Sequence, residues 1–122
     1  MQIELFYIDK DENFKKSFKN VKEAVKEYSK KHDFKTLEIK LVRIDEKNFK
    51  EMRFPGHPTI RINGKDLEDE DENFTLEKRS YESEGKEVTF IPLSLLKKGI
   101  EEYIDASIEA QKMKGETPNQ IC

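Results

Sequence analysis

The sequence has little of several features that would point directly to a function. Its 122 residues include one cysteine and no tryptophan. The single cysteine, Cys122, excludes a disulfide within the chain and a metal centre built from cysteines. No apolar stretch approaches the roughly 20 residues of a membrane-spanning helix, and residues 1–10 lack the basic and small-residue segments of a signal peptide. We therefore expect a cytoplasmic protein that has no membrane partner.

Neither sign of charge dominates. Charged residues make up 40% of the chain, yet the formal net charge is only −3. A chain without a basic excess has no global attraction for nucleic acid, so we expect no nucleic-acid partner. The interleaving of both signs with apolar positions favours a folded domain over disorder, and the bias toward Lys and Glu is typical of heat-adapted proteins. No metal-ligand or nucleotide-binding motif is present, and we expect no cofactor.

The chain length fits one domain, which we place at residues 1–110, with a helix end and a frayed tail over 111–122. The apolar periodicities predict strands at 2–8, 36–44 and 59–62 and helices at 14–31 and 45–53. The turn residues predict a hairpin turn at Asn63-Gly64, an acidic loop at about 66–73 and an extra hairpin at about 76–91 around Glu84-Gly85. A last helix follows Pro92 and is stopped by Gly115 and Pro118.

These elements follow the order β-α-β-α-β-β-α. A β-α-β crossover makes the first two strands parallel, and the later hairpin is antiparallel. The sequence therefore predicts an α/β fold in which a mixed β-sheet has helices on both faces.

One stretch carries a resemblance to a known family. Residues 54–64 read FPGHPTIRING, in which Pro58 opens the third strand and Asn63-Gly64 ends it. With the element order, this stretch resembles the thioredoxin-like superfamily, and within it small, poorly characterised prokaryotic proteins. The resemblance covers about residues 2–105. It implies a thioredoxin-like fold, a cis bond between His57 and Pro58, and a groove beside the first helix in which redox relatives hold extended substrates.

The sequence departs from that family where the family does its chemistry. Redox relatives carry one or two cysteines in the turn after the first strand, where a helix N-terminus favours the thiolate. Here that turn is residues 9–13, and Asp11 stands where the nucleophilic cysteine would be. Some relatives have another cysteine in the region that here reads Glu77 to Tyr81. A carboxylate cannot exchange disulfides, so the redox chemistry is missing.

The residues we expect around the groove are Asp11, Asn13, His57, Pro58 and Thr59. His57 is the most informative of them, because relatives usually have a small residue there. Beside Asp11, its imidazole could act as half of an acid–base pair, help to bind an anion or a metal, or be an ordinary surface-loop histidine. Two ligands are too few for a convincing metal site.

The acidic run from Asp66 to Glu72 lacks the spacing of a calcium loop. We interpret it as a solvated loop, and a weak contact with a divalent cation or a basic partner stays open as an alternative.

These observations favour a non-redox binding or interaction module, without catalytic residues, that receives a protein or an extended peptide in the groove. Two alternatives stay open. One is a thiol- or glutathione-dependent oxidoreductase activity that uses a partner's thiol. The other is a structural role as a homodimer or larger homo-oligomer, in which residues 65–91 cover a sheet edge or swap into a neighbouring copy.

Overall fold

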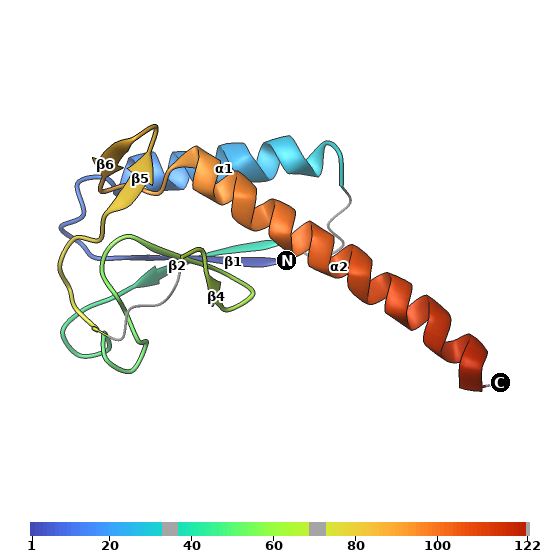
Figure 1. Ribbon diagram of the computed structural model, residues 1–122. Helices are drawn as coiled ribbons and strands as arrows, with labels where there is room; N and C mark the ends of the chain where they lie inside the picture. Colours follow the sequence, from blue (N-terminus) through green and yellow to red (C-terminus); the bar gives the residue numbers. More distant parts are fainter. Residues whose placement is uncertain (33–36, 69–72, 122) are drawn as a thin grey trace.

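The chain folds as an α/β protein with a mixed sheet, and both helices lie on the same side of that sheet (Figure 1). The computed structural model describes residues 1–32, 37–68 and 73–121. The elements in chain order are strand β1 (Gln2–Tyr7), helix α1 (Phe14–Ser29), strands β2 (Glu38–Arg43), β3 (Thr59–Ile62), β4 (Lys65–Asp66), β5 (Tyr81–Ser83) and β6 (Lys86–Val88), and helix α2 (Leu93–Ile121). Neither helix, over its described residues, is long and apolar enough to cross a membrane.

The main sheet has the strand order β2-β1-β3-β4. β1 pairs in parallel with β2, so Leu5 lies beside Leu41, and antiparallel with β3, so Leu5 also lies beside Ile60. β3 turns into β4 at Asn63 and Gly64, whose φ angles of 49° and 82° are the positive values that a type I′ turn requires. The predicted β-α-β unit and the predicted hairpin turn are both confirmed.

β5 and β6 form a separate two-stranded hairpin. Its turn is at Glu84-Gly85, as predicted, with positive φ angles of 52° and 77°. The two strands cover less than the predicted hairpin at about 76–91. The first strand does not extend back to residue 77, because the backbone of residues 77–79 bonds to His57 and does not continue the hairpin ladder.

The larger core lies between the sheet and the two helices. Ile3 and Leu5 alternate along β1 and point to this side, where both are fully buried. The apolar stripe predicted for α1 faces the same core. The helices contribute Val21, Ala24, Val25, Leu96, Ile100 and Ile104 to it.

Residues 45–53, predicted as a helix, form a series of turns. Asp45 does accept hydrogen bonds from the amides of Lys47 and Asn48, at 2.8 and 3.1 Å. The backbone bonds that follow span three, four or five residues, from Arg53 to Lys50, from Phe49 to Asp45 and from Phe54 to Phe49, so no regular helix results. The prediction of helices on both faces of the sheet is therefore wrong.

This turn segment covers the second face of the sheet. Phe6 follows Leu5 in β1 and so points to the opposite side. It forms a smaller core cluster with Ile44 and Phe54, and all three side chains are at most 2% exposed. Phe49, Met52 and Leu76 pack around this cluster. The side chains expected to anchor a helix thus cover the sheet from irregular backbone.

Helix α2 is longer than predicted, because it continues past Gly115 and Pro118 to Ile121. Gly and Pro cost a helix interior about 1 and 3 kcal/mol, which weakens the helix without preventing the backbone from following a helical path. Among residues 93–110 of α2, the last buried side chain is Ile104. Beyond it the helix projects away from the sheet (Figure 1).

If the turn segment is a true second core, Phe54→Ala will lower the free energy of unfolding by about 3–5 kcal/mol, as for other buried phenylalanines. Urea denaturation measures this loss. Leu41→Ala is the matched control, because Leu41 is apolar but 43% exposed on the edge strand β2. We expect its loss to be below about 1 kcal/mol. Equal losses for the two variants would contradict a core on this face.

Candidate functional site

The structure brings the predicted site residues together around the turn into β3. Asp11 lies in the turn after β1, and Asn13 immediately precedes α1. The bond between His57 and Pro58 is cis, as the resemblance implies, and Thr59 is the first residue of β3. Each of residues 54–60 is buried. The predicted residues therefore meet at a closed site.

Asp11 and His57 form a buried pair. Asp11 Oδ2 lies 3.6 Å from His57 Nδ1, and their side chains are only 3% and 6% exposed. The other carboxylate oxygen of Asp11 accepts a hydrogen bond from the amide of Asn13 at 2.9 Å. Within the described part of the chain, Asp11 Oδ2 and His57 Nδ1 have no hydrogen-bond partner. The interpretation of His57 as a surface-loop histidine is wrong, and its predicted closeness to Asp11 is confirmed.

Asn13 joins α1 to the segment after β6. Its side-chain amide donates to the hydroxyl of Thr89 at 2.7 Å, and it makes no side-chain capping bond to α1. Two further bonds lie along the same seam. The hydroxyl of Ser17 accepts from the amide of Ile91, and the side-chain amide of Asn20 donates to the Ile91 carbonyl, at 3.0 and 2.8 Å. The role of Asn13 is thus to hold two segments together beside the site.

The backbone of His57 is occupied by residues 77–79, which we call the strap. The amide of His57 donates to the carbonyl of Glu77 at 3.0 Å, and the amide of Arg79 donates to the carbonyl of His57 at 2.9 Å. His57 and Lys78 form an isolated parallel β-bridge. The main-chain groups that a groove here would offer to an extended peptide are therefore already bonded within the chain.

Arg79 anchors the strap in a buried pocket. Its guanidinium makes two bonds to the carboxylate of Asp66, at 2.9 and 3.1 Å, and a third to the hydroxyl of Thr59 at 3.1 Å. The side chains of Arg79 and Asp66 are 10% and 2% exposed. Burial is the largest single influence and lowers the pKa of Arg79. The hydrogen bonds to Asp66, together with attraction to the negative charges of neighbouring groups, more than offset it, so the pKa of Arg79 is raised.

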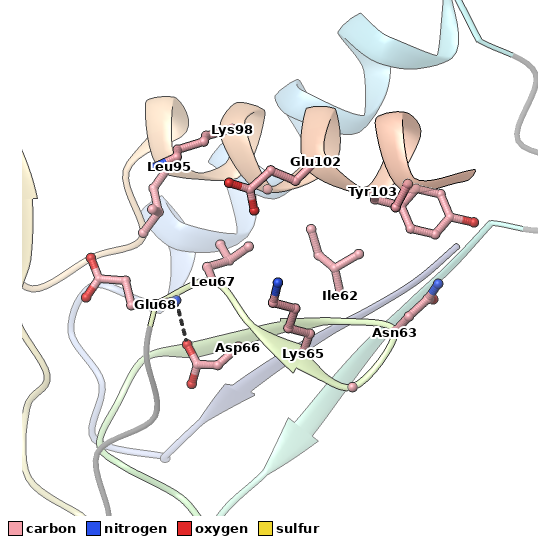
Figure 2. A pocket seen from close by; sticks show the side chains of 13 residues that line it. Ile62, Asn63, Lys65, Asp66, Leu67, Glu68, Leu95, Lys98, Glu102 and Tyr103 are labelled. Atoms are coloured by element: carbon pink, nitrogen blue, oxygen red, sulfur yellow. Dashed lines mark hydrogen bonds between the residues drawn. The ribbon is translucent and has the colours of Figure 1, made fainter. Parts of the chain in front are cut away.

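Asp66 corrects the prediction of a wholly solvated acidic loop. It begins the acidic run, yet it lies in β4 and is buried. Figure 2 shows its side chain turned away from α2, with one oxygen accepting from the amide of Glu68 at 3.1 Å. Residues 69–72 of the run lie outside the described residues. Asp66 and Arg79 were missed by the sequence reasoning, because a carboxylate in an acidic run and an arginine in a charged chain give no sign of pairing.

The turn is also fixed through Thr59 and Tyr81. The hydroxyl of Thr59 donates to the carbonyl of Gly56 at 2.6 Å, and the hydroxyl of Tyr81 donates to the carbonyl of Pro58 at 2.6 Å. Burial raises the pKa of Tyr81. Hydrogen bonds from three separate segments therefore hold the backbone of residues 56–58.

A separate cavity of about 1260 Å³ lies between the β3–β4 hairpin and α2 (Figure 2). Ile62 and Leu67 form apolar parts of its wall, and Lys65 and Glu102 are charged residues of its lining. The hairpin approaches the helix closely at Gly99, where a Cβ atom would lie 2.3 Å from Leu67 Cδ2. None of the five predicted site residues lines this cavity.

Gly56 tests how tightly the strap fits. Its φ is +132°, and an added Cβ would lie 2.9 Å from Arg79 Cβ and 3.0 Å from the carbonyl oxygen of Glu77. Gly85→Ala is the control, since its φ is +77° and nothing lies within 4 Å of an added Cβ. We expect Gly85→Ala to cost about 1–2 kcal/mol of backbone strain and Gly56→Ala a further 1–3 kcal/mol, roughly, of steric overlap.

Urea denaturation gives both costs, and hydrogen exchange of the His57 amide should accelerate only in Gly56→Ala. Equal costs, with unchanged exchange at His57, would show that the strap does not pack on Gly56 in solution.

Among the residues that the structure describes, no group of three or more His, Cys, Asp or Glu side chains is placed to hold a metal ion. The chemistry available at the site is that of the Asp11–His57 pair, the Asp66–Arg79 pair and the backbone of the cis-proline turn. A comparison of the chain with family models, with curated proteins and with solved structures found no match.

Proposed function

We propose that this protein is a non-redox binding module with a thioredoxin-like fold, and that it recognises a protein or peptide at the cis-proline turn. The observation that carries the proposal is the Asp11–His57 pair, whose facing atoms are buried beside Pro58 and lack hydrogen bonds. The parallel pairing of β1 with β2, the antiparallel pairing of β1 with β3 and the cis bond before Pro58 support the family assignment, whereas the missing helix between β2 and β3 does not.

A binding role suits the residue types at the site. Asp11 takes the position that redox relatives give to a nucleophilic cysteine, and a carboxylate can accept hydrogen bonds but cannot exchange disulfides. The single cysteine of the sequence, Cys122, is its last residue, far along the chain from Asp11. Its structure lies outside the described residues.

The pair also indicates what a ligand group would have to supply. Buried polar atoms are nearly always hydrogen-bonded, and leaving one unsatisfied costs about 1–3 kcal/mol. A hydroxyl or amide group from a partner can donate to Asp11 Oδ2 and accept from, or donate to, His57 Nδ1. Because both side chains are at most 6% exposed, the residues that cover them must move aside when such a group enters.

Capture of partners from a lysate tests the proposal. We expect a specific partner to be retained by the wild type and reduced about tenfold or more by Asp11→Asn and by His57→Asn, in line with the loss of a charged hydrogen bond. Asp9→Asn is the matched control. Asp9 lies in the same turn, but its side chain is 61% exposed and pairs with Arg43 at the surface.

Thermal unfolding of each variant establishes that it is folded before capture is compared. A partner retained equally by all four proteins would contradict binding at this site, as would the absence of any reproducible partner.

The geometry of the pair favours one second candidate. A carboxylate that faces Nδ1 of a histidine is the arrangement that orients imidazole as a general base, and apo sites often hold such pairs at more than hydrogen-bond distance. Asp11 and His57 would then activate a thiol brought by glutathione or by a partner protein.

Reduction of insulin and glutathione-dependent turnover distinguish the two candidates. The binding role predicts background rates for Cys122→Ser, which removes the thiol of the chain. A rate about tenfold above background that survives in Cys122→Ser and is lost on adding His57→Asn would favour the enzyme.

A further inference from the structure

The strap occupies the cis-proline turn in the way that a bound peptide would. We propose that the turn and the Asp66–Thr59 pocket form a recognition site for an extended partner segment that carries an arginine, and that residues 77–79 are its internal occupant. This inference rests on the proposed function and names the partner's chemistry. Its three parts are the backbone of His57, the carboxylate of Asp66 and the hydroxyl of Thr59.

The backbone part of the site has the form of strand addition. An added strand binds through main-chain hydrogen bonds to an exposed backbone edge and gains specificity from side-chain pockets. His57 offers one amide and one carbonyl, and the strap uses both, through Glu77 and Arg79. Any extended segment can make these two bonds, so they do not select a sequence.

The selective part is the pocket for the guanidinium. Asp66 accepts both bonds of the Arg79 fork, and Thr59 accepts a further bond from the same group. A planar fork of this kind matches a carboxylate in a way that the point charge of a lysine does not. Arg79 donates its backbone amide to the His57 carbonyl, and its side chain fills the pocket. The backbone register and the side-chain specificity are therefore linked at one position.

A partner segment has to replace the strap in the pocket, because a strap that simply moved away would leave the carboxylate of Asp66 unpaired. Asp66 is 2% exposed, and removing one partner of a buried ion pair is strongly destabilising since the other charge stays uncompensated. A partner that brings its own arginine avoids this penalty, whereas a partner without one does not.

Among the described residues, no strand of the main sheet pairs with the strap. Its only strand pairing in the described chain is the single bridge between Lys78 and His57, and Glu77 and Lys78 are exposed. The residues on either side remain anchored, because Leu76 packs in the second core and Tyr81 is buried in the first. These anchors confine the exchange to the residues between them.

A peptide test can be made with the chain's own strap as the probe. The peptide NFTLEKRSY, which copies residues 73–81, is labelled and titrated with Arg79→Ala, in which the pocket is vacated. We expect the peptide to bind this variant and to bind the wild type at least about tenfold more weakly, since the wild-type site is filled. The same peptide with alanine in place of arginine should lose about tenfold to a hundredfold in affinity, as expected for bonds to a charged group.

The double variant Arg79→Ala, Asp66→Asn is the matched control. It keeps the shape of the pocket but removes the carboxylate, so we expect the peptide to bind it at least about tenfold more weakly than Arg79→Ala. Circular dichroism establishes folding of each variant. If Arg79→Ala does not fold, Arg79→Lys takes its place. A lysine still neutralises the charge of Asp66, but it cannot form the two parallel hydrogen bonds of a guanidinium.

The inference is supported if the peptide binds the folded variant and both the peptide arginine and Asp66 are needed. It is overturned if the folded variant binds no peptide at millimolar concentration, or if the alanine peptide binds equally well. These outcomes are independent of partner capture. If the peptide binds but no partner is captured, only the proposed function is contradicted. If a partner is captured by the wild type and lost in His57→Asn, but the peptide does not bind, only the arginine site is contradicted.

Discussion

The need to compensate one buried carboxylate organises the region around Pro58. Asp66 is almost inaccessible to water, and the guanidinium of Arg79 neutralises it through two hydrogen bonds. This pair fixes the position of the strap, because the amide of Arg79 then meets the carbonyl of His57. A charge in β4 thus determines which backbone lies against the turn into β3, and the strap closes a surface that would otherwise be open.

Two buried polar pairs share this small region and differ in how well they are satisfied. Arg79 and Asp66 bond directly to each other, and the guanidinium donates a third bond to the hydroxyl of Thr59. Asp11 and His57 face each other at 3.6 Å with their facing atoms unbonded. A satisfied pair rigidifies its surroundings, whereas an unsatisfied one is a reason to look for function. One small region thus holds a fully bonded ion pair and a second pair whose facing atoms are unsatisfied among the described residues.

Much of the fold could be predicted, because local signals determine it. Period-two and helical patterns placed β1 and α1, and Asn63-Gly64 and Glu84-Gly85 placed both hairpin turns, whose φ angles have the positive values that such turns need. The resemblance implied the cis bond before Pro58 and brought His57 close to Asp11, and both expectations are confirmed.

The rest depends on contacts between distant residues. Residues 45–53 have helix-like spacing, but their side chains pack on Phe6 and Ile44 from irregular turns. Nothing in the sequence indicates that Asp66 is buried or that its partner is Arg79, which lies 13 residues away.

The strap changes what recognition at a cis-proline turn requires in this chain. Where such a turn is open, an extended ligand needs only to form backbone bonds, and each of these contributes about 1 kcal/mol net. Here the same bonds are already made, so a ligand that forms only these bonds gains nothing by exchange. Any free energy that favours a ligand over the strap must come from groups that the strap leaves without a hydrogen bond. The facing atoms of Asp11 and His57 are such groups. A partner that compensates Asp66 as well as the strap does, and that also bonds to the Asp11–His57 pair, has a net advantage over the internal occupant. In the exchange that we propose, the unsatisfied pair would favour the partner, and the buried ion pair would set the chemistry that the partner has to match.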